Sequence, residues 1–372
     1  MTVYLLLIVF YYLMSFSEDS KPLENKNKKR RCIFLISPMF FLTAFRGLDV
    51  GTDTVQYHRL YYMYNYYYGL ISKIGTSRIE PGYLFLNYIS NSIGLTYFQF
   101  QVIVAIIDYA AIYFVATKYS KNISYFCFLF MTTRTMFSIM NISRSWLSTA
   151  MVLLFATKFI EKRKPLAFCS IVIAVSLFFH TSALFFLLLY PVSYTRLSKK
   201  KMQAVFVSTI VAFMFGKRFF NLIVSIMGRY DAFVEKGYSE TGVAVILNLA
   251  LHLCLFIIIV LMYREEIVST TGNQTDGVVD YSIMIPVSCS LFVICIDIIG
   301  LRLNFANRVS IHFTPLYLIA FTNALAKMKK DKGYFLLKTI VSAVLVIYFV
   351  VILVYRSSWN SVVPYTTFFT TA

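Results

Sequence analysis

The stretch from Tyr334 to Tyr355 reads YFLLKTIVSAVLVIYFVVILVY and contains a single charged residue, Lys338. A helix needs about 20 apolar residues to cross the hydrocarbon core of a bilayer, so this stretch predicts a transmembrane helix. Similar apolar runs occur throughout the chain before it. The predicted spans are residues 2–16, 32–45, 97–117, 123–141, 146–160, 165–179, 182–194, 203–216, 242–263, 283–300, 309–326 and 334–355.

The composition indicates that lipid is the main solvent of this chain. Of its 372 residues, 59% are hydrophobic and 14% are charged, whereas about 25% of a soluble domain is charged. We therefore predict an all-α polytopic integral membrane protein, a single membrane domain over residues 1–372 with about 12 transmembrane helices. The net charge of +18 does not indicate a nucleic-acid partner, because the basic residues form short clusters between the apolar runs.

The distribution of basic residues predicts the orientation. With these spans, the loops on one side carry 20 Lys and Arg residues and the longer loops on the other side carry 12. Cytoplasmic loops are the richer in positive charge, so both termini are predicted outside. The outer loops include residues 46–96, with an interfacial helix at 83–95, and residues 217–241, while the polar loop 264–282 is cytoplasmic. Isolated arginines stand beside outer membrane ends: Arg46, Arg144, Arg218, Arg229, Arg302 and Arg308.

Other polar residues at the outer side form a candidate site. The loop Arg46–Thr54 combines a cation, backbone made flexible by two glycines, and the carboxylate of Asp53. Glu80 precedes Pro81 at the start of the interfacial helix. His180 interrupts the apolar run 165–194, which is why that run is divided into two spans. Each feature also has a plain structural interpretation: a solvated turn, a first-turn charge favoured by the helix dipole, and a hydrogen-bonded core histidine.

Four motifs resemble the EpsG/Wzy-type polysaccharide polymerase family in order and rough spacing. They are Phe45-Arg46-Gly47 with Val50-Gly51-Thr52-Asp53-Thr54, Glu80-Pro81-Gly82-Tyr83, Ser143-Arg144, and Phe179-His180-Thr181-Ser182-Ala183. The family often has glutamine where this chain has Ser145. The resemblance implies an enzyme of the bacterial inner membrane with a substrate cleft that faces the periplasm or exterior. It would join undecaprenyl-diphosphate-linked oligosaccharide repeat units, which serve as donor and acceptor, into a surface polysaccharide. Its other partners would be membrane lipid and a chain-length regulator.

The residues at the outer side suit this chemistry. Arginines grip phosphate oxygens through two N–H groups at once, so four of them are predicted to bind the diphosphate without a metal or a cofactor: Arg46, Arg144, Arg302 and Arg308. The acceptor hydroxyl needs a base, and His180, Asp53 and Glu80 are the candidates. Asp297, near the outer end of its span, is predicted to pair with Arg302 or Arg308.

Two other classes of protein remain open. A transporter or flippase of lipid-linked oligosaccharide would place polar residues near the bilayer midplane, on broken helices in two related halves. An O-antigen ligase-like transferase, or an acyltransferase built around His180, would use similar lipid-linked substrates. The loop Arg46–Thr54 favours the polymerase.

Overall fold

The computed structural model describes residues 1–20, 25–63, 79–227, 242–268, 279–303 and 306–370. Within these ranges the chain is helical and contains no β-strand, apart from one isolated antiparallel bridge between Arg46 and Thr367. It divides into two compact units. Unit 1 comprises Met1–Phe186 with Lys329–Ala372, and unit 2 comprises Leu187–Met328.

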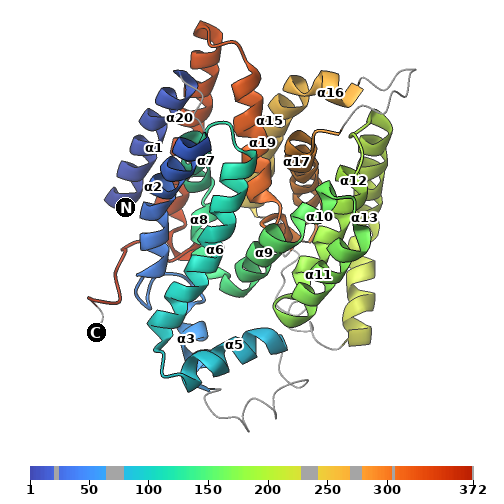
Figure 1. Cartoon of the computed structure of the whole chain (residues 1–372). Coiled ribbons are helices and arrows are strands. Elements are labelled where there is room, and N and C mark those ends of the chain that lie inside the picture. Colours follow the sequence, from blue (N-terminus) through green and yellow to red (C-terminus); the bar gives the residue numbers. More distant parts are fainter. Residues whose placement is uncertain (21–24, 64–78, 228–241, 269–278, 304–305, 371–372) are drawn as a thin grey trace. The chain divides into compact units, whose positions relative to one another are not determined.

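Unit 1 contains most of the helices (Figure 1). They are α1 (Thr2–Ser20), α2 (Asn25–Ala44), α3 (Thr54–Met63), α5 (Pro81–Ser92), α6 (Tyr97–Tyr119), α7 (Ile123–Thr132), α8 (Thr135–Asn141), α9 (Ser143–Phe155), α10 (Thr157–Glu161), α11 (Pro165–Phe178), α20 (Lys332–Tyr355) and the 3-10 turn η3 (Ser357–Trp359). A further 3-10 segment, η1 (Thr181–Leu188), crosses the boundary to unit 2. The predicted interfacial helix is α5, which begins at Pro81 and packs on α3 and α11.

Five helices of the described chain are long and apolar enough to cross a membrane, and up to six if one bent pair forms a single span. They are Thr2–Asp19, Tyr97–Tyr119, Val245–Met262, Tyr281–Gly300 and Lys332–Tyr355. An all-helical, multi-pass membrane protein is therefore confirmed. The other predicted spans coincide with shorter, interrupted or more strongly charged helices, and the number of 12 stays a prediction.

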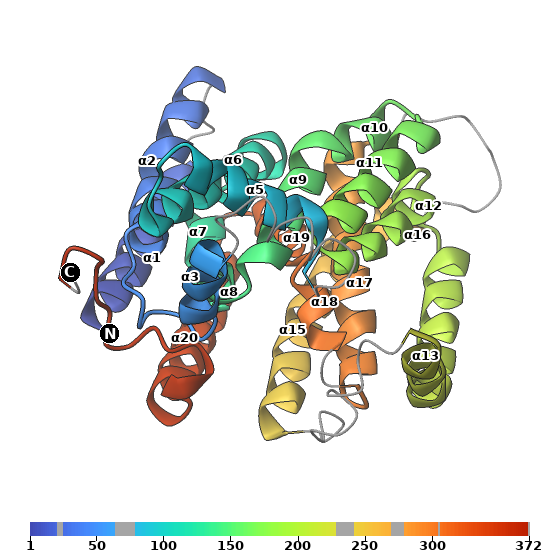
Figure 2. The ribbon, with the colours of Figure 1, turned by 90° about the horizontal axis from the view of Figure 1, so that it is seen from below.

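One predicted span contains a break, and a second break separates two predicted spans. The run 123–141 forms α7 and α8, which bend by 60° at Thr133-Arg134, where Arg134 has a positive φ of 62°. Helix α11 ends at Phe178, directly before the polar residues that were expected to interrupt the run 165–194. The end of α11 lies against α5, and Figure 2 shows α3 and α5 from below.

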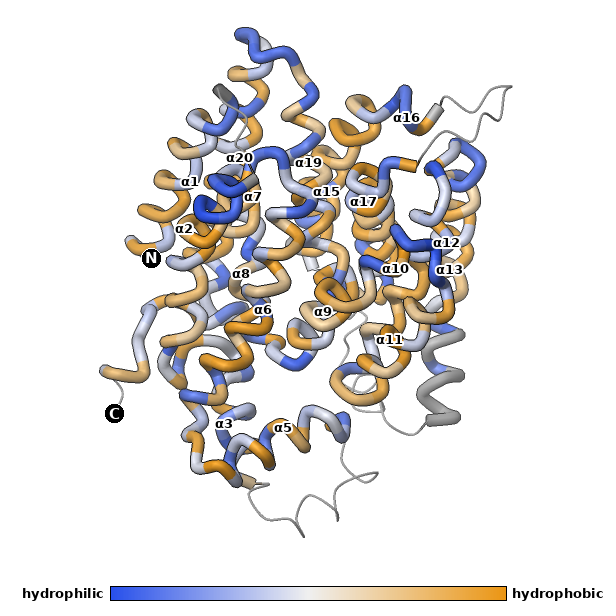
Figure 3. The backbone as a smooth tube through the Cα atoms, viewed as in Figure 1, coloured by the Kyte–Doolittle hydropathy of each residue, from blue (hydrophilic) through white to orange (hydrophobic). Residues whose placement is uncertain are grey.

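Loops predicted on the same side of the membrane contact each other in unit 1. At one end Asp19 accepts a hydrogen bond from Asn122 (3.0 Å) and forms an ion pair with Lys330 (3.5 Å). At the same end Lys118 forms an ion pair with Glu161 (2.7 Å). These contacts join four loops that were all predicted to be cytoplasmic. Hydrophilic residues gather there, at the turn between α6 and α7 and at the start of α20 (Figure 3). The grouping agrees with the predicted alternation of spans.

Unit 2 is built around α17 (Tyr281–Gly300), which packs on its neighbouring helices. The other helices are α12 (Leu189–Ser193), α13 (Lys199–Met227), α15 (Val243–Met262), α16 (Arg264–Val268), α18 (Asn307–Ser310) and α19 (Thr314–Lys327). Helix α13 continues to Met227, so residues 217–227 of the predicted outer loop 217–241 are helical. Arg229 and residues 269–278 of the predicted polar loop 264–282 lie outside the described residues.

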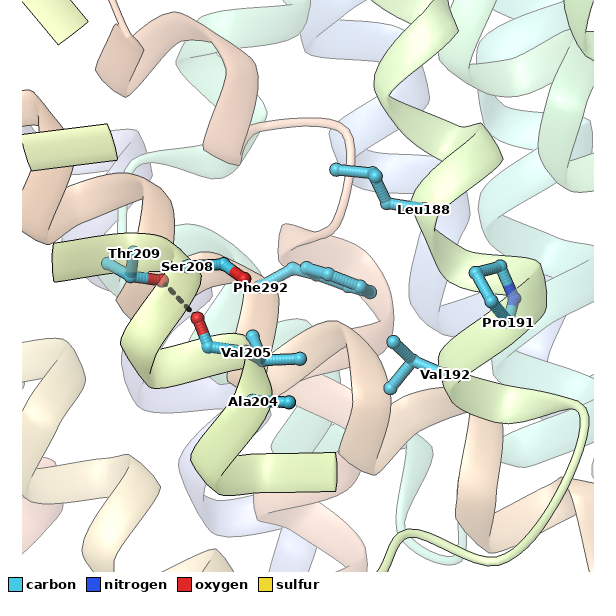
Figure 4. Close-up of a pocket in the computed structure, with 8 residues that line it drawn as sticks. All are labelled: Leu188, Pro191, Val192, Ala204, Val205, Ser208, Thr209 and Phe292. Atoms are coloured by element: carbon cyan, nitrogen blue, oxygen red, sulfur yellow. Dashed lines mark hydrogen bonds between the residues drawn. The ribbon is translucent and has the colours of Figure 1, made fainter. Parts of the chain in front are cut away.

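An apolar pocket of about 290 Å³ lies in unit 2 (Figure 4). Its walls come from η1, α12, α13 and α17, and they are formed by Leu188, Pro191, Val192, Ala204, Val205, Ser208, Thr209 and Phe292. The Thr209 hydroxyl donates to the carbonyl of Val205 (2.8 Å), so it offers no donor to a guest. A pocket lined in this way suits an apolar chain and not a charged group.

The alternation of spans gives a topology test. In a variant that lacks the six native cysteines, Ser92→Cys on α5 should react with an impermeant thiol reagent added outside, once any outer membrane is opened. Lys162→Cys, between α10 and α11, should react only after the cytoplasm is exposed. Both positions are exposed in the structure, so accessibility within the protein does not differ. The reverse labelling pattern would overturn the orientation, and labelling of both from one side would overturn the alternation.

Candidate active site

The Glu80 carboxylate joins three segments of unit 1 that are far apart in the sequence. Its Oε2 accepts a hydrogen bond from Arg144 Nη1 at 2.7 Å, which is also an ion pair. Its Oε1 lies 3.0 Å from His180 Nδ1 and accepts a weaker hydrogen bond from the Thr181 backbone N–H (3.4 Å). Three of the predicted site residues therefore form one cluster, here called the Glu80 cluster: Glu80, Arg144 and His180.

Local sequence explains why these side chains meet. Glu80 is the N-cap of α5, and Pro81 occupies the first helical position, where its missing N–H is not needed. Gly82 lets α5 approach the end of α11, because a Cβ atom there would lie 2.6 Å from the carbonyl oxygen of Phe178. His180 follows two residues after Phe178, where the helix has ended. A larger residue at position 82 would separate Glu80 from His180.

Two tyrosines lie beside the Glu80 cluster. The Arg144 guanidinium lies 5.9 Å from the centre of the Tyr83 ring and interacts with Tyr57, whose hydroxyl acquires a raised pKa through burial. Both tyrosines are buried. The charged side chains keep partial exposure, at 12% for Glu80, 22% for Arg144 and 30% for His180. The histidine is the most accessible of the three.

The charges of the cluster are set by their neighbours. Burial alone would raise the pKa of Glu80, but the hydrogen bond from His180 and the charge of Arg144 outweigh it and hold the pKa below its ordinary value. Glu80 is therefore ionised at neutral pH, and a carboxylate only accepts hydrogen bonds. It follows that His180 Nδ1 carries a proton and that Nε2 is the basic nitrogen when the ring is neutral. The Glu80 carboxylate therefore fixes which ring nitrogen of His180 is protonated.

Asp53 lies at the start of α3, in the loop that the sequence singled out. The loop is fastened to α8: the Thr52 N–H and hydroxyl both donate to Asn141 Oδ1, at 2.5 and 2.9 Å. Gly51 has a φ of 99°, which favours glycine. Asp53 is half-buried and accepts from the Thr52 hydroxyl at 3.3 Å. Among the contacts within the described residues, Asp53 has none with the Glu80 cluster, whereas Tyr57, one helical turn later, interacts with Arg144.

Arg46 is buried, with 2% of its surface exposed. Its Nη1 donates to the Thr43 carbonyl at 2.6 Å, and its backbone carbonyl accepts from Gln101 (3.1 Å). The prediction placed Arg46 in contact with a diphosphate at the surface. In the structure, its guanidinium lies inside unit 1 near Asp108 of α6. The sequence could not show this, because an arginine at a helix end is compatible with either position.

The C-terminal segment fastens the same loop, a feature that the sequence did not reveal. The Gly47 N–H donates to the Thr366 carbonyl (3.0 Å), and the Gly51 N–H donates to the Ser361 carbonyl (2.8 Å). A Cβ atom at Gly47 would lie 2.5 Å from the Thr366 hydroxyl. These backbone contacts depend on the end of the chain returning to the end of α2, for which no local sequence pattern gives a signal.

The two remaining predicted arginines belong to unit 2. Arg302 donates through Nη1 to the carbonyls of Phe213 (3.2 Å) and Met214 (2.9 Å) on α13, and Arg308 is exposed on α18. Neither forms the predicted pair with Asp297, which binds His252 instead. That part of the prediction was wrong, because a histidine on a facing helix could not be placed from spacing along one chain.

Among the described residues, no group of three or more His, Cys, Asp or Glu side chains is arranged to hold a metal ion. The Glu80 cluster contains one carboxylate and one histidine, and that carboxylate is already paired with Arg144. What the cluster offers chemically is one oriented imidazole beside one cation. This combination suits proton abstraction next to a developing negative charge.

Comparison with known proteins identifies the family. The model of the EpsG family matches residues 29–367. The chain belongs to the EpsG family. This is the family of Wzy-type polysaccharide polymerases, as the motifs predicted, and it implies a glycosyltransferase-type activity on lipid-linked oligosaccharides at the membrane. No curated protein and no solved structure gives a significant match.

The charge state of Glu80 in this EpsG-family chain gives a stability test. Glu80→Gln should destabilise the purified protein at pH 7 by about 1.5–3 kcal/mol, because Arg144 loses a charged partner. Since the pKa of Glu80 is lowered in the folded state, its contribution is complete above the ordinary glutamate pKa and is lost as pH falls through the lowered value. The melting temperatures of wild type and variant should therefore converge at acidic pH.

Glu161→Gln is the matched control, because the Glu161–Lys118 pair is about 30% exposed on both sides and exposed pairs contribute little. If Glu80→Gln lowers the melting temperature by the same amount at every pH, Glu80 is not ionised in the folded protein.

Proposed function

We propose that the chain polymerises undecaprenyl-diphosphate-linked oligosaccharide repeat units into a surface polysaccharide at the outer face of a bacterial inner membrane. The observation that carries this proposal is the Glu80–His180 pair beside Arg144. It supplies an oriented base and a cation within one cluster. Membership of the EpsG family supports the general activity, and the basic-residue count supports the orientation.

His180 is proposed as the base. With Nδ1–H donated to Glu80, Nε2 accepts the proton of the acceptor hydroxyl. The freed electron pair of that oxygen attacks the anomeric carbon of the donor, and the bond from that carbon to the diphosphate oxygen breaks. The growing glycan moves to the incoming unit, and undecaprenyl diphosphate leaves with the bonding electrons. General-base catalysis of this kind contributes about 10²- to 10⁴-fold to the rate.

Charge neutralisation of the leaving group is assigned to arginine. Arg144 uses Nη1 for Glu80 and is 22% exposed, so the fork retains donors for a phosphate oxygen. It also lies in the first turn of α9, where the helix dipole favours anions. Arg302 and Arg308 remain proposed ligands, and the burial of Arg46 favours a structural contribution at the loop Arg46–Thr54. No metal is required by this scheme.

The other two candidate bases are assigned lesser roles. Glu80 is engaged by two cationic or donating side chains, which lowers its basicity, so it orients His180. Asp53 remains the alternative base, because it is half-buried and accepts a hydrogen bond only from its neighbour Thr52 among the contacts described. The two proposals separate experimentally, since loss of His180 would leave an Asp53-dependent reaction intact.

A flippase is the second candidate, and one observation favours it. The break between α7 and α8 places Arg134 inside a predicted span, and transporters build substrate sites from broken helices. Arg134 donates to the Tyr348 hydroxyl (2.7 Å) and lies over its ring, which gives the charge a partner inside the protein. The Glu80 cluster, at the helix ends, has no equivalent role in a flippase.

Surface glycan analysis tests the proposal. In a strain that lacks the native protein, His180→Ala should reduce polymer by about 10²- to 10⁴-fold, and Arg144→Lys by roughly ten- to a hundredfold because the planar fork is lost. Single repeat units should then accumulate on the lipid carrier. Arg59→Lys, exposed on α3, is the matched control and should polymerise normally.

Normal polymer from both variants would make the Glu80 cluster structural. A loss of outer-leaflet carrier, in place of an accumulation of single units, would identify a flippase.

A further inference from the structure

Unit 2 contains a second histidine–carboxylate pair. His252 of α15 places Nδ1 2.6 Å from Asp297 Oδ2 on α17. The Tyr317 hydroxyl of α19 donates to the His252 carbonyl (3.0 Å), and its ring meets the imidazole edge-on at a centroid distance of 5.3 Å. The three helices pack on one another (Figure 1). The pair uses the same nitrogen and the same type of partner as the Glu80 cluster.

The position of this pair within apolar helices is costly. Helices α15 and α17 are both long and apolar enough to span a membrane, and His252 and Asp297 lie inside them. Ionisable residues in such helices are rare and usually serve a function. Each is otherwise expensive, because hydrocarbon provides no compensating hydrogen bond. A packing role alone would be met more cheaply by two apolar side chains.

The second ring nitrogen of His252, Nε2, is not used by the pair. Because a carboxylate accepts hydrogen bonds, Nδ1 carries the proton and Nε2 is an acceptor. Among the residues that the structure describes, none donates to Nε2, and 13% of the side chain is exposed. Nε2 can therefore accept a hydrogen bond from a molecule that binds at this position, which pure hydrocarbon could not supply.

We propose that the His252–Asp297 pair is a saccharide-contacting site, at which Nε2 accepts a hydrogen bond from a glycan hydroxyl. Lipid alkyl chains carry no donor, whereas every sugar of a repeat unit carries several hydroxyls. Asp297 fixes the tautomer, and Tyr317 holds the imidazole in place. This inference rests on the proposed function, since it assigns one binding contact for the lipid-linked oligosaccharide and no step of the reaction.

A double substitution tests this proposal. His252→Phe with Asp297→Val removes both partners, a change that is often neutral for stability because no unpaired charge remains. With protein in vesicles and purified lipid-linked repeat units, the half-saturating substrate concentration should rise about tenfold, while the maximal rate stays within about twofold. A pair that only joins two helices would leave both quantities unchanged.

Two further variants keep the outcome decisive. If the double variant does not accumulate, Asp297→Asn is used in its place, because it keeps the shape of the side chain. The asparagine amide can donate to His252 Nδ1, which turns Nε2 into a donor. The half-saturating substrate concentration should then rise as well. Tyr317→Phe removes only the hydroxyl and should have a smaller effect. Wild-type behaviour of the double variant, or of Asp297→Asn in its place, overturns the saccharide site alone, whereas failure of the wild-type protein to polymerise overturns the proposed function.

Discussion

The Glu80 carboxylate determines the arrangement of the candidate active site, because it binds donors from two distant segments of the chain. Glu80 binds Arg144, His180 and the backbone of Thr181, so it fixes the start of α5 against the start of α9 and the end of α11. Neither the Glu80 carboxylate nor the Arg144 guanidinium would be stable alone in a partly buried position, because an uncompensated charge costs several kcal/mol. The geometry of the imidazole is therefore set by contacts that the fold already requires.

The same constraint accounts for the polar residues elsewhere in the chain. Arg46 donates through Nη1 to the Thr43 carbonyl within unit 1, and Asp297 binds His252 in unit 2. At the opposite end of unit 1, Asp19 pairs with Lys338 at 2.5 Å and also binds Asn122. Several charges with low exposure are thus engaged in internal pairs. The accessible ones, among them His180 and Arg308, are those with capacity left for a substrate.

Sequence alone predicted an all-helical membrane protein and the break at His180, because apolar length and an interrupting polar residue are local properties. It also brought Glu80, Arg144 and His180 into one hypothesis through the family resemblance. It could not predict that Glu80 orients His180, because the two residues are 100 positions apart. Three further features depend on tertiary packing in the same way: the burial of Arg46, the contact of Thr366 with Gly47, and the pairing of Asp297 with His252.

His180, oriented by Glu80, is proposed to remove the acceptor proton. The decisive measurement is single-turnover release of undecaprenyl diphosphate from purified, reconstituted protein, together with substrate binding. We expect His180→Gln to bind lipid-linked units as wild type does and to release the carrier about 10²- to 10⁴-fold more slowly, because an amide holds a hydroxyl but takes no proton. Unchanged release, or a defect confined to binding, would contradict it.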